Sequence, residues 1–277
     1  MDQQHYRPRS VSELIDGTMR IVRGHIGTLV PLALVGALPL IVLVALLPMV
    51  ADQEAPDTGL LAMMGAMSIL WLFWFPVFEG ATVHAAGEAY RGRPSSAGSS
   101  LRYSLSRYGR VFGVVILKYA GSAVIPSLVV GFTALVLPIP VVVILALVGV
   151  VASVLLFLRL SLLPATVLLE DNGFADGVRR SFGLTEGHKG HIFLAILLIY
   201  VIWIAIYLVF YLALSLAFMG APFVGIVLGQ IAGALGYTLF WTLTALLYFD
   251  LRIRKEAYDI ELMSQALSTD PARSAAI

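Results

Sequence analysis

The feature that most constrains this chain is its long runs of uncharged, apolar residues. Residues 26–50 carry no charged side chain, and comparable runs recur along the rest of the sequence. A helix rises about 1.5 Å per residue, so each run is long enough to cross roughly 30 Å of hydrocarbon. Apolar residues make up 59% of the chain and charged residues 13%, which leaves too few polar side chains to cover a soluble surface. We therefore expect the bilayer to be its solvent.

We predict an all-α membrane protein in which residues 1–277 form a single transmembrane domain. The first apolar run begins only after 25 mixed residues, which is unlike a cleavable signal peptide. The predicted spans are about 26–50, 60–88, 111–137, 141–169, 191–219 and 223–249.

Basic, amphipathic segments separate these spans, and we predict interfacial helices at about 10–23, 96–109, 173–186 and 250–267. In the first, apolar residues recur at helical spacing, and two arginines stand at its end. Such helices lie in the membrane interface and meet anionic headgroups; packing on a soluble neighbour is the alternative. The candidate headgroup contacts are Arg20, Arg23, Arg107, Arg110, Arg179, Arg180, Lys189, Arg252 and Arg254.

The distribution of basic residues predicts the orientation. Of the 18 Lys and Arg residues, 16 lie in the segments on one side, none lies in the three opposite turns, and two lie within spans. The excess of positive charge marks the cytoplasmic side. We therefore expect both termini in the cytoplasm. We expect no nucleic-acid partner, because the charges are sorted by segment and do not form one patch.

The basic segments also suggest an internal repeat. A glycine followed by a basic and a branched apolar residue lies at the junction between a predicted interfacial helix and the following span. It occurs three times, as Gly24-His-Ile, Gly109-Arg-Val and Gly190-His-Ile. A unit of two spans keeps its orientation, so the three copies would be parallel repeats about an axis along the membrane normal. Basic loops at even spacing in any six-span protein are the alternative explanation.

Three charged residues lie well inside predicted spans, away from their ends, namely Glu79, Lys118 and Arg159. All three lie roughly 12–17 Å inside the predicted cytoplasmic boundary at helical rise. A charge at that depth costs several kcal/mol unless it is paired or hydrated, so it is a functional candidate. We predict a buried cluster in which Glu79 neutralises one cation and the other is left for an anionic headgroup or solute. The alternative is a structural ion pair with a snorkelling lysine.

The other motifs point to packing more than to chemistry. Gly225, Gly229 and Gly233 form a small-residue groove that lets another backbone approach, either span five or another subunit. His84 and Glu88 share a helical face, but more ligands would have to converge for a metal, so we expect no metal and no cofactor. No Walker loop, nucleophile elbow or zinc-protease helix is present, and we expect no enzyme.

Several segments resemble a bacterial family of membrane proteins, the glycerophosphoryl diester phosphodiesterase membrane domain family. Arg7 to Arg20 looks like its opening, and Arg159 to Glu170, Val178-Arg-Arg-Ser181 and Glu186-Gly187 are similar to its central region. Tyr248-Phe-Asp-Leu-Arg-Ile-Arg-Lys-Glu256 looks like its closing motif. The resemblance implies a six-helix inner-membrane protein. The family name comes from members fused to a soluble phosphodiesterase domain, which we do not expect here, so the enzymatic name is not carried over.

The sequence favours a non-catalytic inner-membrane protein of bacteria that contacts anionic lipid or serves as a scaffold or accessory subunit. A partner protein or a second copy could occupy the glycine groove. The alternative is a small-solute or lipid transporter that uses Glu79, Lys118 and Arg159. A transporter predicts a wet cavity lined by these charges, whereas a scaffold predicts that they pair in a dry interior.

Overall fold

A computed structural model describes residues 7–51, 57–220 and 222–256, and all regular structure within these ranges is helical. Six helical segments are long and apolar enough to cross a membrane, which confirms the predicted multi-pass architecture. They are Ile26–Leu47, Thr58–Tyr90, Tyr108–Thr133, Ile139–Leu169, Lys189–Ala217 and Val227–Glu256.

The helices follow one another with short connections. In chain order they are α1 (Val11–Gly24), α2 (Ile26–Ala51), α3 (Thr58–Tyr90), α4 (Ala97–Ser106), α5 (Tyr108–Tyr119), the π-helix η2 (Ala120–Val124), α6 (Ile125–Thr133), α7 (Ile139–Leu160), α8 (Leu163–Leu169), α9 (Phe174–Thr185), α10 (Lys189–Ala217) and α11 (Pro222–Glu256).

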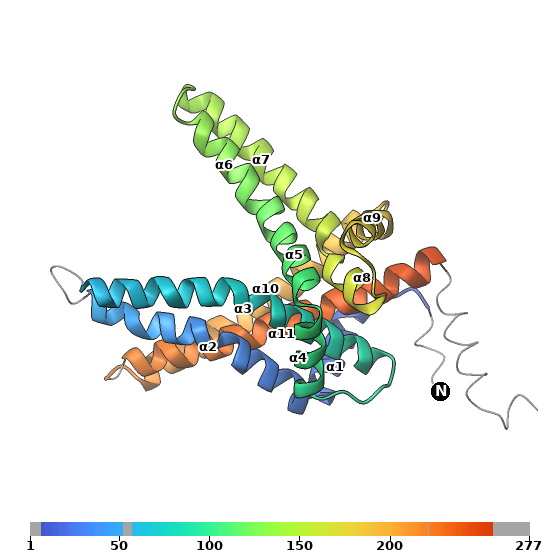
Figure 1. The fold of residues 1–277 in the computed structure, drawn as a ribbon, viewed down its shortest axis with the longest axis horizontal. Helices are drawn as coiled ribbons and strands as arrows, with labels where there is room; N and C mark the ends of the chain where they lie inside the picture. Colours follow the sequence, from blue (N-terminus) through green and yellow to red (C-terminus); the bar gives the residue numbers. More distant parts are fainter. Residues whose placement is uncertain (1–6, 52–56, 221, 257–277) are drawn as a thin grey trace, which may run out of the picture.

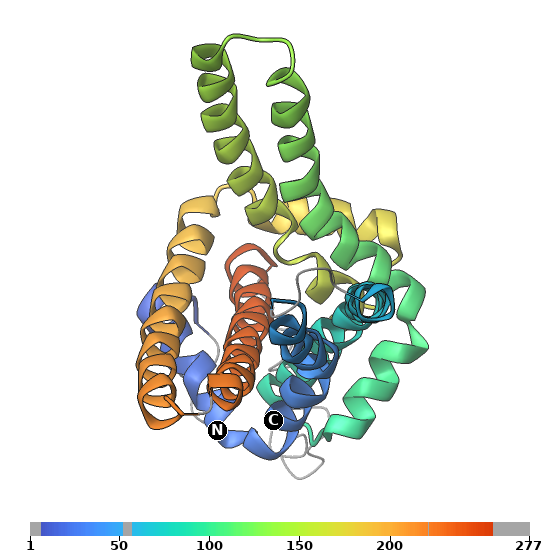
Figure 2. The same ribbon diagram turned by 90° about the vertical axis from the view of Figure 1, so that its left-hand side faces the viewer.

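The long helices form two groups that diverge. Helices α2, α3, α10 and α11 pack together as a four-helix bundle, whereas α6 and α7 form a hairpin that points away from it (Figure 1). Turned by 90°, the hairpin still stands apart from the bundle (Figure 2). Helix α6 packs mainly on α7 and η2, and it contains no buried residue. We call the space between hairpin and bundle the wedge.

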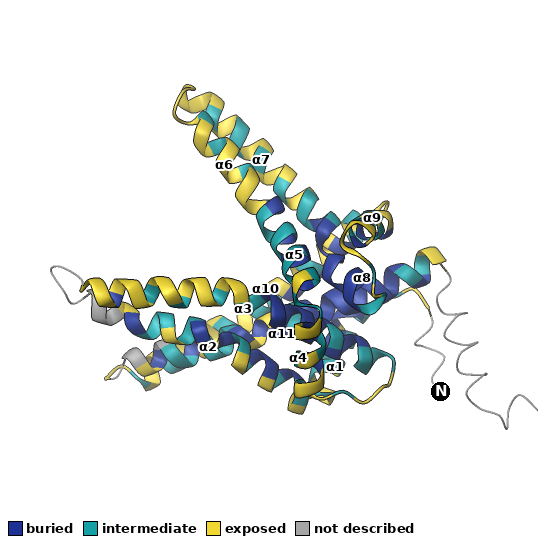
Figure 3. Cartoon of the chain, in the orientation of Figure 1, coloured by how far each residue is buried: buried dark blue, intermediate teal, exposed yellow. Residues whose placement is uncertain are grey.

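The core lies where the two groups meet. Buried residues concentrate near the short helices, and the hairpin is largely exposed along its length (Figure 3). Helix α11 contributes most to this core, because every residue from Trp241 to Leu251 is buried, and Phe78 of α3 packs in the same cluster.

The short helices α1, α4, α8 and α9 gather at one end of the molecule, opposite the turn between α6 and α7 (Figure 1). Ser10 starts α1 with a capping box, because its hydroxyl accepts from the Glu13 N–H while the Glu13 carboxylate accepts from the Ser10 N–H. Leu14 and Ile15 of α1 are buried in the core. The helices predicted at 10–23 and 173–186 therefore exist as α1 and α9.

The single helix predicted at 96–109 is wrong, whereas two predicted spans match the candidate spans Ile139–Leu169 and Tyr108–Thr133 approximately and differ only in detail. The segment 96–109 is not one helix, because Arg107 leaves helical geometry between α4 and α5 (φ −115°, ψ 22°). The span predicted at 141–169 is interrupted after Leu160, and Pro164, which cannot donate a backbone hydrogen bond, lies in the first turn of α8. The helix of the span predicted at 111–137 ends at Thr133.

The separate helix predicted at 250–267 is also wrong in its start. Helix α11 runs unbroken through Asp250 to Glu256, and residues 257–267 lie outside the described ranges. The flanking residues Phe249, Leu251 and Ile253 belong to the core. The carboxylate of Asp250 accepts hydrogen bonds from Arg9 and Arg254, so the helix can continue past the end of the apolar run.

A π-helix joins α5 to α6 at the foot of the hairpin. The N–H of Ile125 donates to the carbonyl of Ala120, five residues earlier, and the Ser122 hydroxyl donates to the carbonyl of Lys118. Pro126 follows in the first turn of α6. Proline has no backbone N–H to donate, and π-bulges of this kind often occur at functional sites.

Candidate functional site

A buried ion pair joins α3 to α5. The Lys118 Nζ lies 2.5 Å from the Glu79 Oε1, and both side chains are 0% exposed. In this buried position each group stabilises the charge of the other, because removing one partner would leave an uncompensated charge. Glu79 and Lys118 were predicted to lie at similar depth, and the structure brings them together.

Aromatic rings enclose the cation of this pair. The Lys118 Nζ lies 4.8 Å from the ring centroid of Tyr119, 5.4 Å from that of Phe240 and 5.7 Å from that of Phe157. A cation within about 6 Å of a ring is attracted by its negative face. The rings come from α5, α11 and α7, so the ammonium group is held where the hairpin meets the bundle.

The second oxygen of the carboxylate has polar groups nearby but no strong partner. Glu79 Oε2 and the indole N–H of Trp241 are both buried without a hydrogen bond within the described ranges. The phenol of Tyr119 is close enough to both groups to interact with them. Glu79, Tyr119 and Trp241 thus form a small polar cluster inside an otherwise apolar region.

Arg159 does not join the predicted cluster. Its guanidinium lies 5.1 Å from the ring centroid of Phe182 on α9, and the Ser181 hydroxyl donates to its carbonyl at 2.6 Å. It makes no ion pair with any described residue. The side chain of Arg159 points from α7 toward α9. The similar depth predicted for Arg159 and the other two charged residues therefore did not determine the direction in which it points around the helix axis. The predicted cluster of three is a pair with a separate cation.

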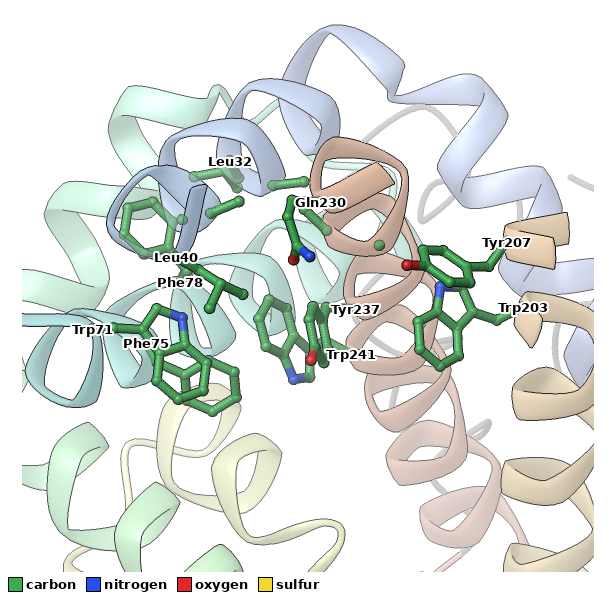
Figure 4. Close-up of a pocket in the computed structure, with 15 residues that line it drawn as sticks. Leu32, Leu40, Trp71, Phe75, Phe78, Trp203, Tyr207, Gln230, Tyr237 and Trp241 are labelled. Atoms are coloured by element: carbon green, nitrogen blue, oxygen red, sulfur yellow. The ribbon is translucent and has the colours of Figure 1, made fainter. Parts of the chain in front are cut away.

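Two apolar cavities lie beside the pair. A central cavity of about 260 Å³ opens among α2, α3, α10 and α11. Figure 4 shows its rings, with Trp71 and Phe75 on one side, Trp203 and Tyr207 on the other, and Gln230 reaching in from α11. A lateral cavity of about 320 Å³ lies among α5, α7, α10 and α11.

The charged residues do not line either cavity. Trp203 and Tyr237 line both, and among the described residues no charged side chain lines either one. The lateral cavity is bounded by Tyr119, Phe157 and Phe240, the same rings that surround the Lys118 ammonium. These aromatic rings therefore separate the ion pair from the lateral cavity.

Five of the predicted headgroup contacts are occupied by acidic partners at the end where the short helices gather. Arg107 and Arg110 both pair with Asp171, at 3.1 and 3.0 Å. The hydrogen bond from Arg107 holds the pKa of Asp171 below its usual value. Asp171 itself has a positive φ of 56°, a conformation that Asp tolerates better than most residues.

A second group of partners surrounds Glu170. Arg180 Nε lies 2.9 Å from its Oε2, and the Tyr248 hydroxyl donates to its Oε1 at 2.8 Å. Arg180 and Arg252 also pair with Glu256. Burial lowers the pKa of Arg180, but the hydrogen bonds to the two glutamates outweigh burial and raise it above its ordinary value. We call these residues, Glu170, Arg180, Tyr248, Arg252 and Glu256, the Glu170 network.

A third group ties the N-terminal segment to α11. The Asp250 carboxylate, 0% exposed, accepts from the Arg9 N–H at 2.6 Å and from Arg254 Nε at 2.8 Å. His191 Nε2 lies 3.2 Å from it. Sequence reasoning missed Asp250 and Glu170 as anchors. The four-residue spacing of Tyr248, Arg252 and Glu256, and of Asp250 and Arg254, was the available signal.

Four predicted headgroup contacts make no ion pair with a described residue. Arg20, Arg23 and Arg179 are exposed, and Lys189 is half-buried. The predicted set of nine thus divides into cations held by the protein and cations left for another partner.

The glycine groove of α11 faces α10 of the same chain. A Cβ on Gly225 would lie 3.6 Å from the Leu214 carbonyl, one on Gly229 3.7 Å from the Tyr211 ring, and one on Gly233 3.8 Å from Tyr207. Within the described residues, no group of three or more His, Cys, Asp and Glu side chains could hold a metal.

No protein-family model, curated protein or solved structure matches this chain. The family resemblance seen in the sequence therefore stays a prediction, and the function is argued from the arrangement of charges and cavities.

Proposed function

We propose that the protein is a non-catalytic, multi-pass membrane protein that binds anionic lipid at its basic end. The observation that supports it is that cations without an ion-pair partner among the described residues lie close in sequence to exposed apolar side chains. Arg23 precedes Ile26, which is 54% exposed; Arg102 precedes Leu105, 47% exposed; and Arg179 follows Phe174, 44% exposed. A cation beside an exposed apolar group suits the boundary between headgroups and hydrocarbon.

This proposal places α1, α4 and α9 as interfacial helices of the cytoplasmic leaflet. The excess of Lys and Arg at this end supports a cytoplasmic location for both termini. The resemblance to the bacterial family supports an inner-membrane location, and the three Gly-basic junctions support three parallel repeats. A scaffold or accessory role is compatible with this arrangement, although the glycine groove faces α10 and leaves the partner surface elsewhere.

The alternative, a transporter that uses Glu79, Lys118 and Arg159, has less support. Two of these side chains form a closed pair with 0% exposure, and they line neither cavity. Arg159 contacts Phe182 instead of the pair. A solute pathway would require water or substrate to reach these charges. Substrate flux into proteoliposomes that is lost in Glu79→Gln while the fold is kept would favour the transporter.

The proposal is tested by removing the exposed, unpartnered cations. Arg20→Gln, Arg23→Gln and Arg179→Gln are combined in one variant, and the lipids retained from nanodiscs of phosphatidylglycerol and phosphatidylcholine are counted by native mass spectrometry. Each cation near an anionic surface contributes about 1 kcal/mol. We therefore expect the variant to lose most of the preference for phosphatidylglycerol with little change in stability.

The matched control replaces the same three arginines with lysine, which keeps the charge. We expect this control to retain the preference for the anionic lipid, because a lysine ammonium also binds phosphate as a point charge. An unchanged preference in the glutamine variant would contradict the proposal.

A further inference from the structure

We propose that the lateral cavity at the apex of the wedge holds one acyl chain of a membrane phospholipid. This inference deepens the proposed function, since it assigns a place to the chain of a lipid whose headgroup contacts lie at the basic end. It rests on the cavity, on the divergence of the helices around it and on its depth.

The shape of the molecule leaves this cavity open to the membrane. The hairpin of α6 and α7 diverges from the bundle (Figures 1 and 2), and on the hairpin side the cavity is lined by Tyr119 of α5 and Phe157 of α7, with no residue of α6. Tyr200 and Tyr237, which line it, are 50% and 40% exposed. In a bilayer this opening faces hydrocarbon, because all the surrounding helices are candidate spans.

The lining of the cavity selects an apolar occupant. Rings and branched aliphatic side chains form its walls, and the polar atoms on them belong to tyrosine hydroxyls and to the Trp203 indole. No carboxylate, ammonium or guanidinium group faces a ligand there, so a charged headgroup would be left without a partner. At about 320 Å³ the cavity falls in the size range of small-ligand sites.

Its depth also favours a chain over a headgroup. Tyr119 follows Arg110 by nine residues, which corresponds to about 14 Å along a helix. Half of a hydrocarbon core of about 30 Å is about 15 Å, so the cavity lies near the inner part of one leaflet. An acyl chain that descends from a headgroup at the basic end reaches this depth.

A chain in this position would complete the dry shell around the ion pair. Phe157, Phe240 and Tyr119 present one side to the cavity and lie between it and the Lys118 ammonium. Hydrocarbon against their outer side keeps water from the low-dielectric region in which the Glu79–Lys118 attraction is strong.

The test fills the cavity with protein atoms. Ile196 is half-buried and lines the cavity, whereas its neighbour Leu197 is 43% exposed on the same helix. Ile196→Trp should displace the chain, and Leu197→Trp is the matched control for an added indole. Native mass spectra are recorded after detergent exchange from zwitterionic nanodiscs, so that the headgroup preference plays no part.

We expect the wild type and Leu197→Trp to retain one phospholipid more than Ile196→Trp. Equal retention by all three proteins, or retention of a polypeptide in place of the lipid, would overturn the proposal. In mixed nanodiscs Ile196→Trp should still prefer phosphatidylglycerol, whereas the triple glutamine variant should lose that preference and still keep one lipid. The acyl-chain site and the proposed function can therefore fail separately.

A second measurement needs no cavity variant and remains decisive if Ile196→Trp does not fold. Wild-type protein is taken from vesicles of phosphatidylcholine with brominated mid-chain carbons and exchanged into detergent. A retained chain places bromine beside Trp203, so we expect weaker tryptophan fluorescence than in protein from unbrominated vesicles. Equal intensities would overturn the proposal.

Discussion

Helices α11 and α7 show that hydropathy and burial run in opposite directions in this protein. The span formed by α7 and α8 has the highest mean hydropathy of the six, yet only 6% of its apolar window is buried inside the protein. The span in α11 has the lowest mean hydropathy of the six, and 61% of its window is buried. A soluble protein would show the reverse order.

The difference follows from the solvent. Lipid tails are as apolar as leucine, so a span that faces lipid needs apolar residues everywhere and gains little from packing. A span inside a bundle can carry polar side chains if they find partners, as Tyr248 and Asp250 do. In this chain the less hydrophobic helix is the structural centre, and the most hydrophobic one is a peripheral arm.

The largest expected effect comes from breaking the ion pair beside α11. Glu79→Gln leaves the Lys118 charge buried and unpaired, and we expect a loss of about 3–5 kcal/mol of unfolding free energy. Denaturant titration in detergent micelles measures this loss. Glu79→Gln combined with Lys118→Met should recover most of it, because the charge is removed with its partner. Single and double variants of equal stability would contradict the assignment of a structural pair.

A leucine truncation compares the two regions with the same chemistry. Leu246→Ala in α11 (1% exposed) should cost about 2 kcal/mol or more, because it leaves a cavity in the core. Leu147→Ala in α7 (64% exposed) should change stability by about 0.5 kcal/mol or less. Thermal unfolding of the two variants in the same detergent checks the contrast. Equal losses would show that the hairpin is packed in solution.

Two glycine substitutions sharpen the comparison with a smaller change. A Cβ on Gly236 of α11 would lie 1.6 Å from Trp203 Nε1, so Gly236→Ala must displace the indole and should cost about 1–3 kcal/mol. Gly131 of α6 has no atom within 4 Å of such a Cβ, and Gly131→Ala should be neutral or stabilise by up to about 1 kcal/mol. Unfolding midpoints measure both. A neutral Gly236→Ala would argue against the tight α10–α11 contact.

The smallest expected effect is a pH dependence at Asp171, at the end where the short helices gather. The hydrogen bond from Arg107 lowers the pKa of the folded Asp171, so its contribution to stability is present at neutral pH. It is lost as the pH falls through that lowered value, because the protonated carboxyl no longer attracts Arg107 and Arg110. Asp171→Asn should remove this acid-sensitive part of the unfolding curve, and asparagine tolerates the same backbone conformation. A variant with the wild-type profile would exclude Asp171 as its source.

The sequence was informative where a pattern has one structural meaning. Long apolar runs predicted the six candidate spans. Rotation about a helix axis is not contained in such patterns. Arg159 was predicted at a similar depth to Glu79 and Lys118, but its side chain turns to Phe182, and only the packing of α7 against α9 determines this direction.

The cavities and anchors were harder to predict for the same reason. Trp203 and Gly236 are far apart in the sequence, and their contact depends on how α10 crosses α11. Asp250 was interpreted as the start of a new helix, because a charge at the end of an apolar run commonly marks the membrane boundary. Its partners Arg9 and His191 come from distant segments, and they remove the need for a break.

The π-helix η2 has a consequence for the register of the hairpin. One residue of an α-helix turns the following residues by about 100°, and the wider turn at Ala120–Val124 takes up one residue without that rotation. Deleting a single residue there would let α5 run into α6 as a regular α-helix while both keep their present faces. An insertion or deletion within α6 itself would instead rotate the residues that follow it, and with them the face of α6 that contacts α7. The hairpin thus has one position at which its length can change and its pairing survive.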